Sequence, residues 1–296
     1  MIHPEDVAAF VDAARLAAVA GGEEVLSLIL EHPGRVRLWR KGGRDVVTEA
    51  DLRSRDAIRR VIRDWCPVDP VLDEESAAER RLPPGRVWVV DPLDGTVNFA
   101  SGLPLWSVSV AVAVDGEVVA GAVRSASGAV YQAGLRLAAL RDGRPVCPSR
   151  VRLLDDAVVS VTVAPGFSAE QEARACEYVG RLASRVRGVR VFCSGALELC
   201  WLAEGRLDGC ICPSGAFFSA AAGALIAGRA GCQVLDLEGR PYRAGESTGL
   251  LAAATPELAR ALLDILAGAG GTRPASVSSD NSVSEVSEGE AGRGSS

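Results

Sequence analysis

The stretch that decides the fold runs from residue 87 to residue 99 and reads Val87-Trp88-Val89-Val90-Asp91-Pro92-Leu93-Asp94-Gly95-Thr96-Val97-Asn98-Phe99. Its first four residues are apolar and favour strands, which predicts a buried strand. Two carboxylates, a glycine and a hydroxyl follow at once. Pro92 fixes its own φ and Gly95 permits a turn that other residues resist, so we expect Asp91 and Asp94 to be directed from a turn toward one point.

Two carboxylates directed at one point need a cation. The segment contains no sulfur and no imidazole, and the side chains of Asp91 and Asp94 with the carbonyl of Leu93 offer only oxygen. Oxygen ligands suit a hard ion such as Mg²⁺ better than they suit Zn²⁺. The alternative at this point is an Asx-type loop, in which the aspartates only accept hydrogen bonds from their own backbone.

The composition limits the class of protein. A chain of 296 residues with 48% hydrophobic residues can bury a sizeable core, as one large domain or as two closely packed halves. It contains no apolar run long enough for a bilayer and no signal-peptide pattern, so we expect a cytoplasmic protein without a membrane partner. A net charge of -6 and the lack of an aromatic-basic stripe argue against a nucleic-acid partner.

Histidine and cysteine offer little chemistry. His3 and His32 are the two histidines, too few for a histidine-rich zinc site, and both lie near the N-terminus. The eight cysteines are scattered and form no C-x-x-C pair, so we expect reduced core residues. Chemistry is therefore expected from carboxylates, hydroxyls and a metal.

In the first half, the spacing of apolar residues predicts one long or broken helix over 5–31, interrupted at Gly21-Gly22. An edge strand is expected over 35–40, followed by a flexible loop at Lys41-Gly42-Gly43. Thr48-Glu49-Ala50-Asp51 has the form of a capping box that begins a helix. Further strands are expected at 71–72, 107–114, 117–123, 129–133 and 137–140, with hairpin turns at 115–116 and 142–143.

In the second half, strands alternate with helices. Strands are expected at 158–163, 189–193, 208–212, 232–235 and 249–254, and helices at 168–183, 196–204, 217–230 and 255–267. From Gly268 onward the composition changes to Gly, Ser, Glu and Asp. This composition predicts a disordered tail over 269–296.

Three blocks together carry a resemblance. Val47-Thr48-Glu49-Ala50-Asp51, Leu72-Asp73-Glu74-Glu75-Ser76 and the segment from Asp91 to Phe99, in this order and spacing, resemble the inositol monophosphatase family of Mg²⁺-dependent phosphomonoesterases. The likeness extends more weakly over about residues 5 to 268. It implies an α/β fold, a layered α-β-α-β-α sandwich with a largely antiparallel sheet in the first half (1–145) and a mixed sheet in the second (146–268). It also implies a homodimer.

The resemblance assigns metal ligands. It implies that Glu74, Asp91 and the Leu93 carbonyl hold a first Mg²⁺, and that Asp91 with Asp94 holds a second one more weakly. Glu75 is implied to be a catalytic acid, either behind the metal ligands or at an outer metal site. The acids are expected to meet the start of the 217–230 helix at the seam between the halves.

The resemblance also assigns catalytic and substrate-binding roles. From the residues alone, Asp51 is either a first-turn carboxylate favoured by the helix dipole or a functional group. The family's matching aspartate helps to position the attacking water, here together with Thr96. Lys41 falls where the family has a loop lysine near the phosphate. The backbone amides of Gly95 and Thr96 are expected to receive phosphate oxygens.

The chain departs from the family pattern at three single positions, and the Gly-x-Gly-Ala stretch expected after Tyr131-Gln132-Ala133 is also absent. Ser219 in Phe217-Phe218-Ser219-Ala220-Ala221-Ala222-Gly223 stands where the family has an aspartate that binds the second metal, and a serine there is also a natural N-cap for the helix. Cys212 stands where inositol-specific members carry a glutamate that contacts the ring, which argues against inositol phosphate. Asp73 stands where the family has glycine.

Two functions follow from this pattern. The first is a Mg²⁺-dependent phosphomonoesterase that acts on a small phosphorylated metabolite, such as a sugar, nucleotide or amino-alcohol phosphate. The second is a family member with lost or changed phosphatase chemistry, which would act as a phospho-ligand-binding or regulatory protein or as a repurposed biosynthetic enzyme. Ser219 and Cys212 motivate the second.

Overall fold

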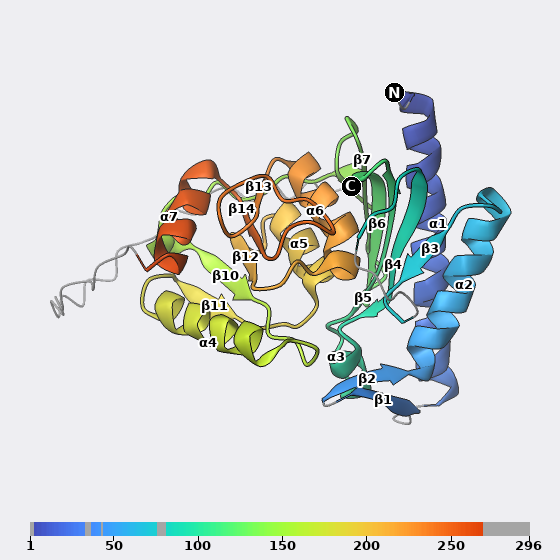
Figure 1. Cartoon of the computed structure of the whole chain (residues 1–296), viewed down its shortest axis with the longest axis horizontal. Helices are drawn as coiled ribbons and strands as arrows, with labels where there is room; N and C mark the ends of the chain where they lie inside the picture. The colour runs from blue at the N-terminus through green and yellow to red at the C-terminus, as the bar shows by residue number, and fades with distance from the viewer. Residues whose placement is uncertain (1–2, 33–36, 43, 76–80, 269–296) are drawn as a thin grey trace, which may run out of the picture.

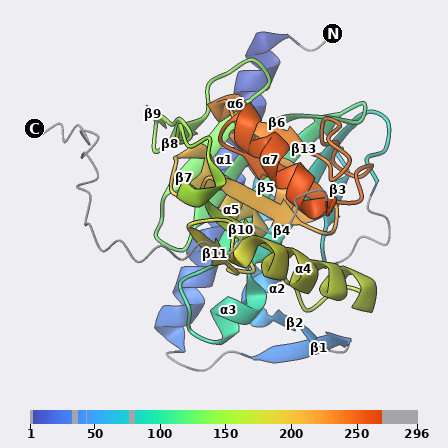
Figure 2. The same cartoon turned by 90° about the vertical axis from the view of Figure 1, so that its left-hand side faces the viewer.

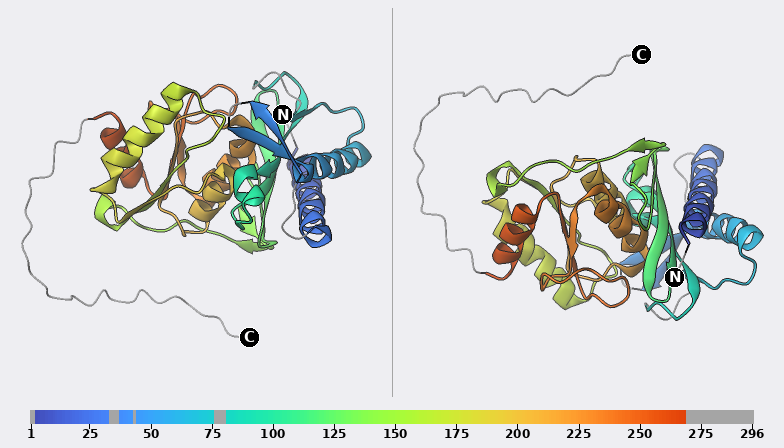
Figure 3. Two further views of the ribbon diagram at one scale, coloured as in Figure 1. Left: turned by 90° about the horizontal axis from the view of Figure 1, so that it is seen from below. Right: turned by 90° about the horizontal axis from the view of Figure 1, so that it is seen from above.

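The computed structural model describes residues 3–32, 37–42, 44–75 and 81–268. These residues form alternating layers of helices and sheets in the order α-β-α-β-α, as expected (Figure 1). Seen from below and above, a helix pair covers each outer face and another helix pair lies between the two sheets (Figure 3). Within the described ranges, no helix is both long and apolar enough to cross a membrane. The predicted tail over 269–296 lies outside the described residues.

Helices α1 (Pro4–Glu31) and α2 (Glu49–Trp65) cover the outer face of the first sheet. α1 is continuous, so no break occurs at Gly21-Gly22. A Cβ on Gly21 would lie 2.6 Å from Ser54 Oγ of α2, and one on Gly22 would lie 2.3 Å from the Arg124 guanidinium. The glycines therefore permit close packing of α1. The predicted capping box is confirmed, since Thr48 and Asp51 bond reciprocally at the start of α2.

The first sheet has the strand order β3-β4-β5-β6-β7-β8-β9. Its strands are β3 (Val71–Asp73), β4 (Arg86–Asp94), β5 (Ser107–Val114), β6 (Glu117–Ser125), β7 (Val130–Gly134), β8 (Leu140–Arg141) and β9 (Arg144–Pro145). β3 is parallel to β4 and every other pair is antiparallel. Asp115 and Gly116, both with positive φ, form the predicted hairpin turn between β5 and β6.

A separate pair of strands, β1 (Leu38–Gly42) and β2 (Asp45–Thr48), precedes α2. β2 was not predicted from the sequence. The prediction of a flexible loop at Lys41 and Gly42 was wrong, because both residues belong to β1 and pair toward β2. Gly43 and residues 35–36 of the predicted edge strand lie outside the described residues.

The second sheet has the order β11-β10-β12-β14-β13 and is mixed, as predicted. Its strands are β10 (Val158–Val161), β11 (Gly188–Arg190), β12 (Gly209–Cys212), β13 (Gln233–Leu235) and β14 (Leu250–Ala253). Helices α4 (Ala169–Ala183) and α7 (Pro256–Leu266) lie on its outer face (Figure 2). A short 3-10 turn at Leu154–Asp156 was not predicted.

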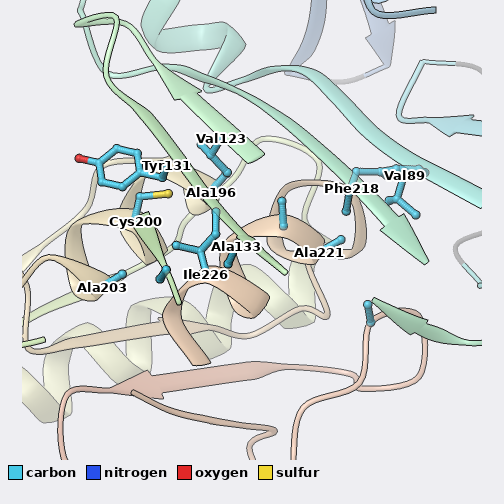
Figure 4. Packing of buried hydrophobic residues seen from close by; sticks show 14 of the residues in the cluster. Val89, Val123, Tyr131, Ala133, Ala196, Cys200, Ala203, Phe218, Ala221 and Ile226 are labelled. Atoms are coloured by element: carbon cyan, nitrogen blue, oxygen red, sulfur yellow. The ribbon is translucent and has the colours of Figure 1, made fainter. Parts of the chain in front are cut away.

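Helices α5 (Gly195–Ala203) and α6 (Phe217–Ala230) fill the space between the sheets. Both are apolar nearly all round, as a helix covered on every side must be. Figure 4 shows the packing of these helices against the inner face of the first sheet, with Val89, Val123, Tyr131, Ala133, Ala196, Cys200, Phe218, Ala221 and Ile226 in one cluster. The middle layer therefore ties both halves of the chain into one core.

All eight cysteines are free, as expected. Four of them, Cys200, Cys210, Cys212 and Cys232, are buried in the core. The expectation of core residues was wrong for Cys147 and Cys176, which are exposed.

Candidate active site

The acids of the decisive stretch lie inside β4, and the chain turns after them. Asp91 pairs with Ser109 of β5 and Asp94 with Ser107, with a shift of register between them. Pro92, which has no N–H to give to a ladder, fits such a bulge. The turn comes at Gly95, whose φ is +89° and where a Cβ would lie 2.6 Å from the Leu105 carbonyl oxygen. Only glycine suits this position.

Asp91 is almost fully buried, with 3% of its surface exposed. Its Oδ1 accepts a hydrogen bond of 3.2 Å from the Leu93 N–H, so one oxygen makes the Asx-type bond that was the alternative to metal binding. Burial, and then the negative charges of Glu74 and Asp94, raise the pKa of Asp91 well above its ordinary value. The carboxylates of the site therefore repel one another, and a cation would relieve this repulsion.

Asp94 links the two halves of the chain. The hydroxyls of Ser107 and Ser194 donate to its Oδ2 at 3.0 and 2.7 Å. The N–H groups of Gly195 and Ala196, at the start of α5, donate to Oδ1 and Oδ2 at 3.1 and 2.9 Å. Burial raises the pKa of Asp94 to about 6, and these hydrogen bonds partly offset the shift. Asp94 thus satisfies donors at the N-terminus of α5.

Asp51 and Thr96 meet beside the Leu93 carbonyl. Thr96 Oγ1 lies 3.0 Å from Asp51 Oδ1 and 2.9 Å from the Leu93 oxygen, so its one proton serves one acceptor at a time. Asp51 Oδ2 accepts from the N–H and the hydroxyl of Thr48. Burial raises the pKa of Asp51 to about 6, although the bonds from Thr48 and Thr96 oppose the shift. Asp51 is therefore both the capping-box acid and a neighbour of the site.

Lys41 lies between two acids. Its Nζ is 3.1 Å from Glu74 Oε1 and 2.8 Å from Glu75 Oε1. Burial opposes the charge of Lys41, but the two carboxylates outweigh it and raise the pKa of the ammonium group. Burial raises the pKa of Glu75 to about 7, with Lys41 acting in the opposite direction. The ammonium thus neutralises part of the acidic end.

Asp73, which replaces the glycine of the family pattern, is fully buried. It forms an ion pair with Arg59 of α2. The next residue, Glu74, donates its N–H to the Val90 oxygen at 3.2 Å, so β3 stays alongside β4. The substitution therefore does not displace Glu74 from the acidic end.

The predicted metal ligands line one pocket, but they are not arranged as the coordination shell of a metal ion. In the ranges that the structure describes, no three His, Cys, Asp or Glu side chains are close enough to hold a metal ion as they stand. Asp94 accepts hydrogen bonds from the start of α5, and Glu74 pairs with Lys41, so both acids already have partners. A metal therefore requires at least Glu74 to rotate away from Lys41.

The pocket has a volume of about 190 Å³ and lies between the end of β4 and the starts of α5 and α6. Eight of the predicted site residues line it: Glu74, Asp91, Leu93, Asp94, Gly95, Thr96, Cys212 and Ser219. Lys41, Asp51 and Glu75 are not among the lining residues. Lys41 pairs with the lining residue Glu74, and Asp51 accepts a hydrogen bond from the lining residue Thr96. The seam predicted from the sequence is thus where the pocket lies.

Ser219 is the third residue of α6, and the prediction that it caps this helix was wrong. The N-cap residue is Ala216, whose φ is +43° and whose methyl side chain can neither donate nor accept a hydrogen bond. Ser219 Oγ lies 3.5 Å from the Ala216 oxygen, a long contact, and it faces Gly195 of α5. A hydroxyl therefore lines the pocket where a carboxylate was expected by resemblance.

Cys212 lies at the end of β12 in the pocket wall. It is 5% exposed, and its Sγ lies 3.4 Å from Ser214 Oγ. Burial raises the pKa of its thiol, so the side chain is neutral. At Cys212 the pocket wall is therefore weakly polar and uncharged.

Sequence reasoning missed Glu198, which also lines the pocket. This residue is 1% exposed, and burial raises its pKa to about 7. A signal was present, because Glu198 is the one acid in Gly195-Ala196-Leu197-Glu198-Leu199-Cys200-Trp201-Leu202-Ala203, a segment predicted as a helix. The sequence did not show that this helix is buried on all sides, so Glu198 was not recognised as a buried acid of the pocket. Ser107 and Ser194, the hydroxyl partners of Asp94, were missed for the same reason.

Comparison with known proteins identifies the family. The model of the inositol monophosphatase family matches residues 6–269. The chain is 36% identical over 237 residues to the inositol-1-monophosphatase SuhB of Mycobacterium tuberculosis, covering 78% of this chain and 81% of the relative. It is 31% identical over 220 residues to a fructose-1,6-bisphosphatase/inositol-1-monophosphatase of Thermotoga maritima, covering 73% and 82%.

Solved structures agree with these matches. The extragenic suppressor protein suhB from Bartonella henselae superposes with a TM-score of 0.79 at 26% identity, covering 87% of this chain and 98% of that one. The Thermotoga maritima IMPase superposes with a TM-score of 0.76 at 27% identity, covering 87% and 96%. The layered sandwich expected from the resemblance is thus confirmed. The chain belongs to the inositol monophosphatase family and is, with it, a metal-dependent phosphatase of phosphomonoesters.

Proposed function

We propose that the protein is a Mg²⁺-dependent phosphomonoesterase that acts on a small phosphorylated metabolite. The observation that carries this proposal is the acidic end of the pocket. There Asp91, Asp94 and Glu74 line one wall, and burial and mutual repulsion raise the pKa of Asp91. Such an arrangement is costly unless a cation compensates it.

The donor atoms fit Mg²⁺. The carboxylates of Glu74 and Asp91 with the Leu93 carbonyl would hold one ion, and Asp91 with Asp94 would hold a second one more weakly, because these are hard oxygen donors. When bound, Mg²⁺ supplies positive charge that offsets the charge on the phosphate and on the leaving oxygen. The Leu93 carbonyl is already positioned in the pocket wall, where Thr96 Oγ1 lies within 2.9 Å of it.

Thr96 and Asp51 orient the attacking water. With its proton directed to Asp51, the hydroxyl of Thr96 presents its lone pairs to the pocket and accepts a hydrogen bond from the water. Asp51 is itself held by two bonds from Thr48, so the orientation is rigid. This pair corresponds to the roles implied by the resemblance, with Glu75 supporting the acidic end through Lys41.

Lys41 acts as a phosphate-binding residue. Its ammonium now pairs with Glu74 and Glu75, and a rotation of Glu74 toward a metal would leave Lys41 with a donor for a phosphate oxygen. Gly95 and Thr96 line the same part of the pocket and are the proposed backbone contacts of the phosphate. The two changes would occur together when the site is loaded.

The identity of the alcohol is proposed from the part of the pocket wall that α6 and β12 form. Cys212 and Ser219 are neutral, so this wall differs from the pattern of inositol-specific members. We propose a sugar, nucleotide or amino-alcohol phosphate ahead of inositol phosphate. Because relatives are named inositol-1-monophosphatase, inositol phosphate belongs in any substrate panel.

A phospho-ligand-binding or regulatory protein is the second candidate. Ser219 removes a carboxylate from the pocket, and Asp94 already accepts four hydrogen bonds. A relative from Pasteurella multocida, 34% identical over 234 residues, is named Nus factor SuhB. The absent carboxylate and the bonds of Asp94 favour weaker occupation of the second metal position, and the name of the relative motivates a regulatory role.

The deciding experiment is phosphate release with and without Mg²⁺, across sugar, nucleotide, amino-alcohol and inositol phosphates. The phosphatase proposal expects Mg²⁺-dependent release from at least one of them, and loss of release in Asp91→Asn. If wild type releases nothing from any ester and Ser219→Asp restores release, the second candidate is correct.

The assembly and the surroundings of the protein are also proposals. We propose a homodimer in the cytoplasm, with a small phosphorylated metabolite as partner and with neither nucleic acid nor a membrane bound. Light scattering on a gel-filtration peak tests the dimer, since a monomer mass at micromolar concentration would contradict it.

A further inference from the structure

Glu198 is a buried acid that the proposed mechanism does not use. It lies on α5, between the two sheets, and lines the pocket together with Cys210 and Cys212 of β12. Its backbone oxygen accepts a long contact of 3.4 Å from Cys210 Sγ, so the helix is fixed against this strand. Ser194 links the carboxylate to Asp94, because its N–H donates to Glu198 Oε1 and its hydroxyl donates to Asp94 Oδ2.

The carboxylate is only partly satisfied. Glu198 Oε1 accepts a hydrogen bond of 3.3 Å from the Ser194 N–H. Oε2 is fully buried and has no hydrogen-bond partner among the described residues. The nearby hydroxyl of Ser160 forms a side-chain hydrogen bond that lowers the pKa of Glu198, although neither Ser160 Oγ nor Glu198 Oε2 has a partner of normal geometry among the described residues. A buried acceptor left in this state costs free energy unless a ligand supplies the donor.

The surroundings lack a positive charge. Glu198 forms no ion pair with any side chain in the described ranges, and no Lys, Arg or His lines the pocket there. The groups that interact electrostatically with Glu198 are Asp94 and the thiols of Cys193, Cys210 and Cys212. They are acidic or neutral, so the charge of Glu198 is not compensated by the protein.

The surroundings also argue against a metal at this acid. Glu198 is not part of any group of three acids, cysteines or histidines close enough for a cation, as judged over the residues that the structure describes. The wall also presents the apolar side chains of Phe167, Leu199, Phe217 and Leu250, beside the uncharged polar side chains of Thr162, Gln171 and Ser214. A single carboxylate beside apolar side chains suits an organic group that carries its own apolar body and one charged donor.

We infer that Glu198 binds the ammonium group of a phosphorylated amino alcohol, whose phosphate lies at the Asp91 end of the same pocket. This inference rests on the proposed function and specifies its substrate class. The ammonium gives Glu198 Oε2 the donor and the charge that the protein lacks. The carbon chain between the two charged groups lies against the apolar side chains of the wall. Glu198 is thus a specificity-determining residue.

The test compares pairs of esters that differ only in the terminal group: 2-aminoethyl with 2-hydroxyethyl phosphate, 3-aminopropyl with 3-hydroxypropyl phosphate, and the four-carbon pair. Wild type is expected to show a kcat/KM at least about tenfold higher for the amine in the pair of best length, as for a hydrogen bond between charged groups. Glu198→Gln is expected to bring this ratio to about one, while hydrolysis of the hydroxyl ester stays within about twofold, because only the ammonium bond is charge-assisted.

Glu204→Gln is the matched control. Glu204 is also a largely buried acid at α5, but it lies outside the pocket and pairs with Arg141 and Arg206. Its substitution is expected to leave the amine-to-hydroxyl ratio unchanged. Measured with the hydroxyl ester, which brings no ammonium to Glu198, the half-saturating Mg²⁺ concentration of Glu198→Gln is expected to equal that of wild type.

Several results would overturn the inference. These are equal rates within every pair, a preference for the hydroxyl ester, a preference that survives in Glu198→Gln, or a weaker Mg²⁺ requirement curve in that variant, which would make Glu198 a metal ligand. If wild type hydrolyses no ester, the proposed function fails separately. Calorimetric titration with the amine and hydroxyl esters then decides, since amine-selective binding lost in Glu198→Gln supports recognition and its absence refutes it.

Discussion

The two ends of the pocket are built in opposite ways. At the acidic end, Asp91 and Asp94 come from β4, and Glu74 is the residue after the adjacent strand β3. The other part of the wall, here called the far end, contains Ser219, Cys212 and Glu198 from α6, β12 and α5, and Glu198 is linked to Asp94 through Ser194. The acidic end concentrates charge for a metal and a phosphate, whereas the far end is suited to distinguishing between alcohols. Changes at the first end should therefore affect catalysis of every substrate, and changes at the second should affect the choice of substrate.

Asp91→Asn is the strongest test of this division. We expect kcat/KM to fall at least about 100-fold for every ester, because even partners outside the metal's own ligands cost 10- to 100-fold when removed. The rise in melting temperature that Mg²⁺ gives wild type should disappear in the same variant. Steady-state kinetics and thermal unfolding measure the two effects. A loss confined to one substrate class would show that Asp91 does not serve the common chemistry.

Thr96→Ala removes the hydroxyl between Asp51 and the Leu93 carbonyl. We expect kcat to fall about 10- to 100-fold, as for loss of a group that orients a reacting partner. Thr96→Ser keeps the hydroxyl and should retain most of the activity, which controls for packing. Because the water is common to all substrates, the amine-to-hydroxyl ratio should not move. Equal activity of the alanine and serine variants would remove Thr96 from the mechanism.

The smallest effect concerns the stability of the metal-free protein. The folded-state pKa values of Asp51 and Asp94 are about 6 and that of Glu75 is about 7, above their ordinary values of 3.8 and 4.5. Their stabilising contribution is complete below the ordinary pKa and is lost as pH rises through 6 to 7. We expect the melting temperature without metal to fall by several degrees between pH 5 and pH 8. Saturating Mg²⁺ should restore most of it at pH 8.

Differential scanning fluorimetry, with a chelator and with Mg²⁺, measures this dependence of the melting temperature on pH. Asp91→Asn carries one charge fewer among the repelling acids, so its pH dependence should be shallower. A metal-free melting temperature that rises from pH 5 to pH 8 would contradict the repulsion at the acidic end.

The sequence predicted the acidic end better than the far end, for a physical reason. Asp91, Asp94 and Thr96 follow one apolar strand within a few residues, so local patterning and the resemblance were enough to locate them. Ser107 and Ser194 bond to Asp94 across the fold, and the second is 100 residues away. Such contacts depend on how the layers stack, which periodicity does not specify.

The same distinction separates the correct and incorrect element predictions. Helices with caps and clear apolar spacing were predicted best: the start of α2 at its capping box was correct, and α7 was predicted to within one residue at each end. β2 and the end of β1 were missed because they pair with each other and bury little, so they leave a weak pattern. Ser219 was taken for a cap because its residue type favours that position, but α6 begins two residues earlier at Phe217.

The N-terminus of α5 has one further consequence. Asp94 holds the N–H groups of Gly195 and Ala196, and Glu198 accepts the N–H of Ser194 from the same helical turn. One helical turn therefore connects Asp94, a proposed metal ligand, to Glu198, the proposed specificity-determining residue. If binding of Mg²⁺ or of the ammonium group shifts this turn, the affinity for the other ligand changes. Thermodynamic linkage makes the factor by which each changes the affinity for the other the same. Magnesium affinity measured with and without an amino ester would report the size of this linkage.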